Sequence, residues 1–133
     1  MNRLIVTALS LALAVPAAAQ KPPAPAQVAA VVGTWKVDPK QVRGRKDAPR
    51  LVIVRADSSA SWGTETVRWR IRGDRLLLAI GGEWENYRLR LKGRTLTLSE
   101  GDLTRPVSFE RVGPPTPRAA NIAVPADPDR PGA

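Results

Sequence analysis

The chain has 133 residues and a formal net charge of +9, from 21 Lys and Arg against 12 Asp and Glu. It contains neither Cys nor His, which excludes thiolate and imidazole metal sites and acid–base catalysis by histidine. The length predicts one domain, and the positive charge favours polyanions as partners.

The first 19 residues are typical of an export signal. A short basic start precedes an apolar run from Leu4 to Val15, and the small residues Ala17 and Ala19 fit a cleavage site before Gln20. An uncleaved anchor helix is the alternative, but the apolar run is shorter than the about 20 residues that a bilayer core requires. We therefore expect residues 1–19 to be a signal peptide and the mature protein to be periplasmic or secreted.

Proline-rich segments flank the middle of the chain. Residues 20–30 hold three Pro and four Ala, which predicts an extended linker. Residues 113–133 hold six Pro, which predicts a disordered tail. The domain between them, residues 31–112, has 17 basic and 10 acidic side chains, so its net charge is 17 − 10 = +7.

In this domain, apolar and polar residues alternate with period two and glycines separate the runs. We expect antiparallel strands over the ranges 33–38, 50–56, 60–64, 66–72, 75–80, 85–92, 94–99 and 106–111. No segment after the signal shows a helical period. Short strands joined by tight turns predict a meander, whose edges disappear if it closes into an up-and-down barrel. A β-sandwich is the alternative.

The turns set which residues face each other. A two-residue turn at Gly73-Asp74 places Trp69 opposite Leu78, and one at Lys92-Gly93 places Tyr87 opposite Leu98. At Gly81-Gly82, a four-residue loop is preferred because a two-residue turn would set Leu78 opposite Glu85. That loop would lift Trp84 to the rim of the barrel.

Two short motifs mark the ends of the predicted sheet: Gly33-Thr34-Trp35 opens the first strand and Phe109-Glu110-Arg111 closes the last. With this Gly-x-Trp motif, the domain resembles the lipocalin-like domains of small exported bacterial proteins. The resemblance implies a small all-β barrel in which Trp35, after Gly33, closes one end and Arg111 lies across the indole. A guanidinium over an indole contributes about 0.5–2 kcal/mol.

Arginines gather on the outer face of the predicted sheet. The register places Arg72 opposite Arg75 and Arg75 opposite Arg90, with Leu77 exposed among them. The predicted anion-binding face consists of Arg68, Arg70, Arg72, Arg75, Arg88 and Arg90. Because guanidinium groups bind phosphate and carboxylate in a bidentate manner, the partner would be an anionic envelope polymer or an acidic protein. A surface that only confers solubility is the alternative.

The loop 38–49 is also basic, and the resemblance implies that it overhangs the barrel mouth. A small amphipathic ligand with an anionic head would there meet the loop and two rim tryptophans. The predicted ligand-binding residues are Lys40, Arg43, Arg45, Lys46, Trp62 and Trp84. The alternatives are a mobile solvated loop, a Trp62 that packs in the core and a Trp84 that plugs the rim. Whether the barrel has a cavity stays open.

Acidic residues form the last candidate group: Glu83, Glu85, Glu100 and Asp102. The predicted register sets Glu85 opposite Glu100, and two such carboxylates could bind a hard cation or act as acid and base. No calcium-loop spacing is present, so we expect no metal, no cofactor and no enzymatic activity. The sequence favours an exported module that binds a ligand or an anionic partner. The alternative is an interaction or inhibitor protein that uses the outer arginine face.

Overall fold

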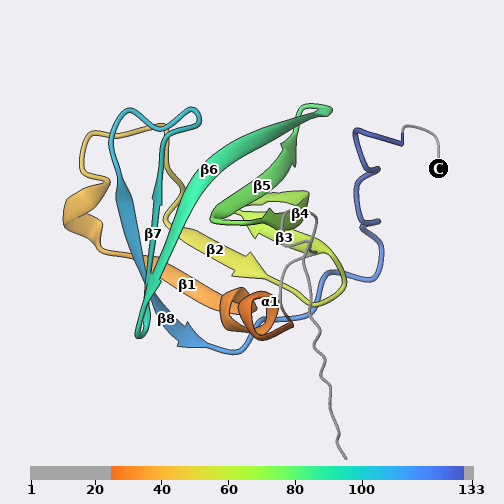
Figure 1. Ribbon diagram of the computed structural model, residues 1–133, viewed down its shortest axis with the longest axis horizontal. Helices are drawn as coiled ribbons and strands as arrows, with labels where there is room; N and C mark the ends of the chain where they lie inside the picture. The colour runs from red at the N-terminus through yellow and green to blue at the C-terminus, as the bar shows by residue number, and fades with distance from the viewer. Residues whose placement is uncertain (1–24, 131–133) are drawn as a thin grey trace, which may run out of the picture.

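A computed structural model describes residues 25–130 and shows a closed barrel of eight antiparallel strands (Figure 1). Each strand pairs with the next along the chain, and the last pairs with the first. The predicted all-β up-and-down barrel is confirmed. The strands are β1 (Gly33–Val37), β2 (Leu51–Val54), β3 (Ser59–Trp62), β4 (Glu65–Arg72), β5 (Arg75–Ile80), β6 (Glu83–Lys92), β7 (Thr95–Ser99) and β8 (Val107–Gly113). The predicted signal peptide lies outside the described residues.

The register agrees with the prediction in the β4–β5 hairpin, where Trp69 pairs with Leu78 and Arg72 with Arg75. The preferred four-residue loop between β5 and β6 is wrong. Gly81 and Gly82, with φ angles of 63° and 84°, form a two-residue turn that pairs Leu78 with Glu85. Two successive left-handed glycines favour this turn because it matches the twist of the strands.

The predicted β6–β7 register is also wrong, by two residues. The turn consists of Gly93 and Arg94, so that Leu98 pairs with Leu89 instead of Tyr87. A shift of two residues leaves every side chain on the same face, and apolar residues still face apolar ones. The period-two pattern therefore fits both registers equally well.

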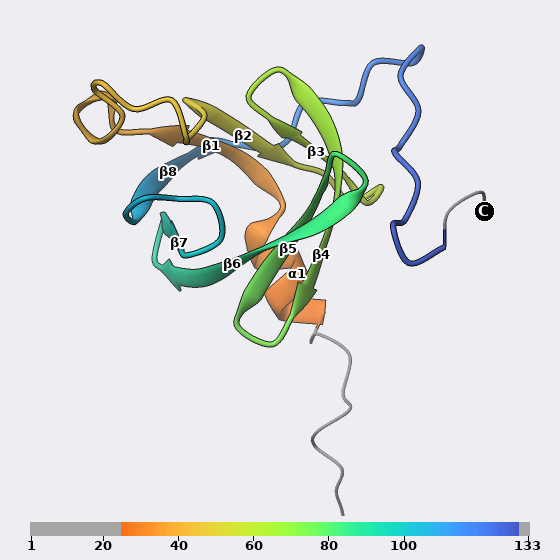
Figure 2. The ribbon, with the colours of Figure 1, turned by 90° about the horizontal axis from the view of Figure 1, so that it is seen from above.

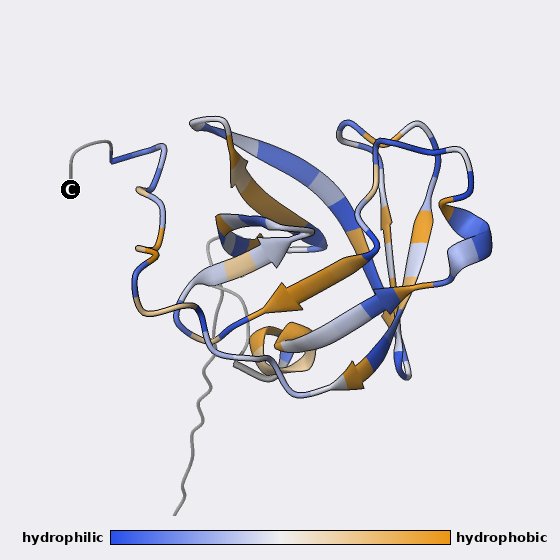
Figure 3. Ribbon diagram, turned by 180° about the vertical axis from the view of Figure 1, so that it is seen from behind, coloured by the Kyte–Doolittle hydropathy of each residue, from blue (hydrophilic) through white to orange (hydrophobic). Residues whose placement is uncertain are grey.

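The inward side chains form one continuous buried cluster, and orange apolar segments alternate with blue hydrophilic ones along several strands (Figure 3). Four large aromatic side chains lie in this cluster: Trp35, Trp69, Tyr87 and Phe109. In a barrel of short strands, such side chains occupy the interior that a ligand would need.

Both ends of the barrel are covered. At one end lies α1 (Pro25–Val31), where an extended linker was predicted (Figure 2). Val28 and Val31, three residues apart on the helix, pack against the core, and burial of this apolar face favours the helix. At the other end, Val42 follows the 3₁₀ turn η2 (Pro39–Gln41) and is buried in the core cluster together with Leu103.

After β8, the described part of the predicted disordered tail, residues 114–130, runs along the outside of the barrel beyond β3 and β4 (Figures 1 and 2). It forms no helix or strand but is held by hydrogen bonds. The Thr34 hydroxyl donates to the Pro114 carbonyl at 2.7 Å, and Arg55 Nε donates to the Thr116 carbonyl at 2.7 Å. Within residues 25–130, no helix has the length and apolar character needed to span a membrane.

Candidate functional site

A hollow of about 240 Å³ lies on the outer side of β6 and β7. It is lined by Arg88, Arg90, Thr97, Ser99 and Pro106. The register explains the grouping, since Arg88 pairs with Ser99 and Arg90 with Thr97, all outward from the core. Two guanidinium groups and two hydroxyl groups therefore share one site, and all four can donate hydrogen bonds.

The groups in this hollow differ in their existing partners. Arg88 Nε lies 3.2 Å from a carboxylate oxygen of Glu100, and the Thr97 hydroxyl lies 2.9 Å from that of Ser108. Arg90 is exposed, and none of the acidic side chains within residues 25–130 lies within ion-pair distance of it. Arg90 is therefore the guanidinium group in the hollow that has its donors available.

Glu100 neutralises the neighbouring arginines. Its carboxylate accepts from Arg75 at 2.6 Å and also contacts Arg88, which faces Arg75 across β5 and β6. The predicted opposition of Arg75 and Arg90 is wrong because of the β5–β6 register. The hydrogen bond from Arg75 holds the pKa of Glu100 below its usual range. Glu100 thus separates two like charges that would otherwise repel each other.

The tail binds two of the three predicted arginines on β4. Arg68 Nε donates to the Pro125 carbonyl at 2.7 Å, and Arg70 lies 3.0 Å from the Asp129 carboxylate. Leu77, which was expected to be exposed, is only 5% exposed. Of the six predicted arginines, Arg68 and Arg70 therefore hold the tail, Arg75 and Arg88 hold Glu100, and Arg72 and Arg90 remain.

Trp84 does not lie in a rim loop. It belongs to β6, pairs with Ala79 and lies beside Arg70, whose guanidinium carbon is 4.0 Å from the indole centroid. Trp62 packs against the core, with its ring 5.4 Å from that of Tyr87. Trp84 therefore lies on the outer face of the barrel, and Trp62 packs against the core.

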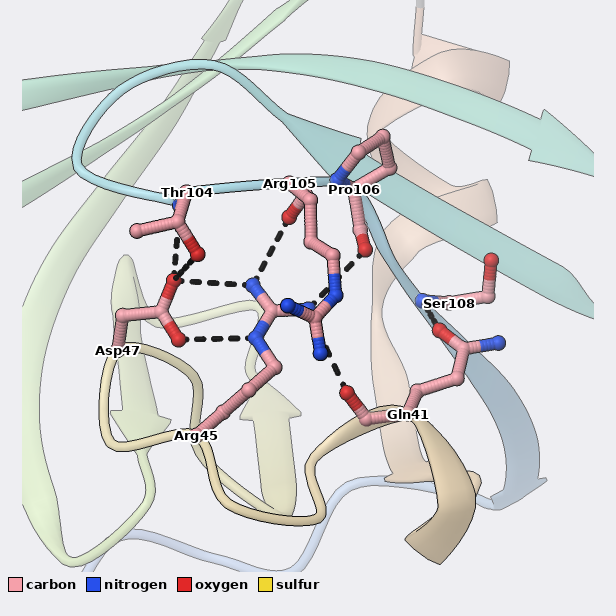
Figure 4. A network of polar contacts seen from close by, with 7 residues as sticks. All are labelled: Gln41, Arg45, Asp47, Thr104, Arg105, Pro106 and Ser108. Carbon is pink, nitrogen blue, oxygen red and sulfur yellow. Dashed lines mark hydrogen bonds and ion pairs between the residues drawn. The ribbon is translucent and has the colours of Figure 1, made fainter.

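The basic loop between β1 and β2 is pinned to the loop before β8 by Arg45 (Figure 4). The Arg45 side chain is 4% exposed and binds both carboxylate oxygens of Asp47, at 2.9 and 3.0 Å. It also donates to the carbonyls of Arg105 and Pro106, at 2.8 and 3.2 Å. Arg45, which was predicted to bind a ligand, acts as a structural brace whose donors are occupied by these partners.

Asp47 completes this brace. Its carboxylate accepts from the backbone N–H of Thr104 at 2.8 Å and from the Thr104 hydroxyl at 3.0 Å. The hydrogen bond from Arg45, followed by that from Thr104, holds the pKa of Asp47 well below its usual range. The other predicted ligand-binding residues of the loop, Lys40, Arg43 and Lys46, are exposed.

The acidic residues do not form the predicted pair. Glu100 is bound to arginines, and Glu85 pairs with Leu78 on β5. Burial, together with Asp102 and Glu83, raises the pKa of Glu85. Asp102 accepts from the Tyr87 hydroxyl at 2.8 Å. Burial, followed by this hydrogen bond, raises the pKa of Tyr87 far above its usual value. Among residues 25–130, no three acidic side chains gather in a way that could hold a metal ion.

At the α1 end, Arg111 lies across Trp35, with its guanidinium carbon 5.1 Å from the indole centroid. Arg111 also donates to the Val32 carbonyl at 2.7 Å. A Cβ atom on Gly33 would lie 2.8 Å from an Arg111 nitrogen, so only glycine leaves room for the guanidinium. This is the arrangement that the lipocalin resemblance implies for these three residues.

Comparison with known proteins gives no match, whether to a family model, to a curated protein or to a solved structure. The lipocalin resemblance therefore depends on the Gly-x-Trp motif and the arginine of the last strand, and stays a prediction. Function has to be argued from the surface of the barrel itself.

The sequence predicted Arg88 and Arg90 as site residues but neither their hydroxyl neighbours nor the pairing of Glu100 with Arg75 and Arg88. Thr97 and Ser99 alternate with inward leucines on β7, which is a signal for outward polar groups beside β6. The position of Glu100 depends on its left-handed backbone, with a φ angle of 68°, and the following Gly101 is the only local sign of such a turn.

Proposed function

We propose that this chain is an exported, non-enzymatic binding protein whose β6–β7 hollow holds a phosphate or carboxylate group of an anionic envelope polymer. The observation that carries the proposal is the hollow itself, where Arg88 and Arg90 face Ser99 and Thr97 across two paired strands. Export, and hence a periplasmic or secreted location, belongs to the proposal through the predicted signal peptide.

The buried aromatic core favours a surface site over an internal ligand. The aromatic core occupies the barrel, and the loop that would cover the mouth is fixed by Arg45. The small amphipathic ligand that the sequence first suggested would have to displace these aromatic side chains and break the Arg45 contacts. The alternative that the sequence offered, an outer arginine face, is therefore the better supported.

The chemistry of the hollow suits an oxyanion. A planar guanidinium presents two parallel N–H donors to phosphate or carboxylate, and Arg90 has these donors available. Hydroxyl groups of Ser99 and Thr97 can donate further hydrogen bonds at the same place. Because the hollow is open to solvent, each single contact is weak, and a polymer with repeated anionic groups gains affinity through multivalency.

Binding of fluorescent linear polyphosphate, followed by anisotropy, tests the proposal. We expect Arg90→Gln to weaken binding by about fivefold, as loss of a charge-assisted hydrogen bond predicts. Lys36→Gln, which removes one exposed charge from β1, is the matched control and should change affinity by less than about twofold. Equal effects of the two substitutions would show charge-driven association without a site. Mass spectrometry of the exported protein tests cleavage before Gln20.

A further inference from the structure

We propose that the outer face of β4, β5 and β6 is a docking surface for an extended, proline-rich segment that carries an acidic residue. In this chain, the tail of residues 114–130 is bound to Arg68 and Arg70 on the β4 side of that surface. The docking surface consists of Arg68, Arg70, Leu77, Ala79 and Trp84, and it is separate from the hollow on β6 and β7. The partner is a protein whose segment of this kind replaces the tail.

The contacts of the tail show what the surface recognises. Arg68 donates to the Pro125 carbonyl, and Arg70 binds the Asp129 carboxylate. Nearer to β8, Arg55 donates to the Thr116 carbonyl in the same manner. Prolines have no backbone N–H, so a proline-rich segment cannot join a sheet edge, and its carbonyls are its available backbone groups. Arginine side chains that donate to carbonyls suit such a segment.

The floor of the surface is apolar although it faces outward. Leu77 and Ala79 are 5% and 7% exposed, and neither belongs to the core cluster inside the barrel. Their partners on β4 are Arg70 and Arg68, the two residues that hold the tail. An apolar floor with a tryptophan at its side is how grooves bind extended proline-rich peptides.

The tail satisfies this surface incompletely. Arg70 Nε and Trp84 Nε1 are buried and have no hydrogen-bond acceptor among the described residues. The two donors belong to adjacent side chains, since the Arg70 guanidinium lies over the Trp84 ring. A buried donor without an acceptor is costly. A segment that places one more carbonyl or carboxylate oxygen beside Arg70 Nε or Trp84 Nε1 would make one more hydrogen bond than the tail and would bind more tightly.

The tail competes from within the same chain, at an effective concentration in the millimolar range. It therefore keeps Arg68 and Arg70 occupied until a better-fitting segment replaces it. Net charge alone does not select the segment, because the tail carries two acidic and two basic residues: Asp127, Asp129, Arg118 and Arg130. The docking surface therefore selects a segment by the order of its prolines and its acidic residue.

The first experiment uses a full chain with a protease site inserted between Gly113 and Pro114. After cleavage, a labelled peptide of residues 114–130 should bind the barrel about tenfold more tightly than it binds the uncut chain, because the attached tail no longer competes. Arg70→Gln should weaken this binding by about tenfold, as loss of an ion pair from a partly buried site predicts. Arg72→Gln, on the same strand, is the matched control and should leave the affinity unchanged. Equal binding of a scrambled peptide would overturn the proposal.

The second experiment leaves the chain uncut and so does not depend on the cleaved barrel staying folded. A nitroxide on Ala126→Cys, in a chain without other cysteines, should broaden the NMR signal of the Trp84 indole. Arg70→Gln, or an excess of the unlabelled peptide, should restore that signal. A signal that the peptide leaves unchanged would show that the surface binds no such segment in trans, whatever the result for polyphosphate and Arg90.

Discussion

Arg45 is the residue whose loss we expect to unfold the β1–β2 end of the barrel first. Its guanidinium makes five hydrogen bonds of 2.8 to 3.4 Å, two to Asp47 and one each to the carbonyls of Gln41, Arg105 and Pro106. Arg45→Leu keeps an apolar stem but removes all five. It leaves the Asp47 carboxylate without its cation and three carbonyls without this donor.

The magnitude follows from these contacts. Hydrogen bonds to charged groups contribute about 1.5–3 kcal/mol each and are not additive, so we expect Arg45→Leu to lower the free energy of unfolding by about 3 kcal/mol. For a domain of this size, each kcal/mol corresponds to about 4–8 °C in Tm, which gives a decrease of about 12–24 °C. Thermal unfolding followed by circular dichroism measures it.

Arg43→Leu is the matched control, because Arg43 lies in the same loop, is exposed and should change stability by less than about 0.5 kcal/mol. If Arg45→Leu unfolds within about 1 kcal/mol of the unsubstituted protein, the loop is not held by this brace. The lid hypothesis for a ligand at the barrel mouth would then regain its support.

Two further predictions concern the same fold. The folded-state pKa of Asp47 lies below its unfolded value of about 3.9, so its stabilising effect is present above that pH and is lost as pH falls toward the folded value. Urea unfolding should show that Asp47→Asn has a lower free energy of unfolding than the unsubstituted protein at neutral pH, and that this difference shrinks as pH falls to strongly acidic values. A difference that stays constant with pH would contradict this. Gly33→Ala should displace the Arg111 guanidinium from Trp35 and cost about 1–3 kcal/mol, unless Arg111→Ala is combined with it. Equal costs of Gly33→Ala with and without Arg111 would show that the two residues do not interact.

The sequence pattern predicted the strands because a half-buried strand has an apolar side chain at every second residue. Val67, Trp69 and Ile71 alternate with arginines, and all three are buried. The same pattern could not choose between registers two residues apart, because both keep each side chain on its face. That choice depended on the backbone angles of Gly81 and Gly82, which composition does not give.

Segments without a period could not be predicted in this way. Composition predicted an extended linker and a disordered tail, since neither segment buries much apolar surface by its own local pattern. Their structure comes from long-range contacts. Arg55 reaches the carbonyl of Thr116, 61 residues away, and Arg111 reaches that of Ala30, 81 residues away. Such pairs leave no trace at short spacing in the sequence.

The arginine face shows why counting charges overstates the positive surface. Asp129 binds Arg70 from the tail, and Glu100 binds both Arg75 and Arg88. These partners lie far from the arginines in the sequence, so alternation alone made all six arginines look equivalent. The hollow keeps an exposed guanidinium at Arg90, whose attraction for anions falls with salt.

The docking surface of the tail should respond differently to salt, and this separates the two proposed sites. The tail binds this surface through one ion pair, from Arg70 to Asp129, and one hydrogen bond, from Arg68 to the neutral Pro125 carbonyl, beside an apolar floor. Screening weakens the exposed ion pair but has little effect on the hydrogen bond to the carbonyl and on apolar burial. At a salt concentration that releases polyphosphate from the hollow, Arg68 should therefore still hold the Pro125 carbonyl of the tail. One barrel would then offer two binding surfaces, one governed by ionic strength and one by the fit of a peptide.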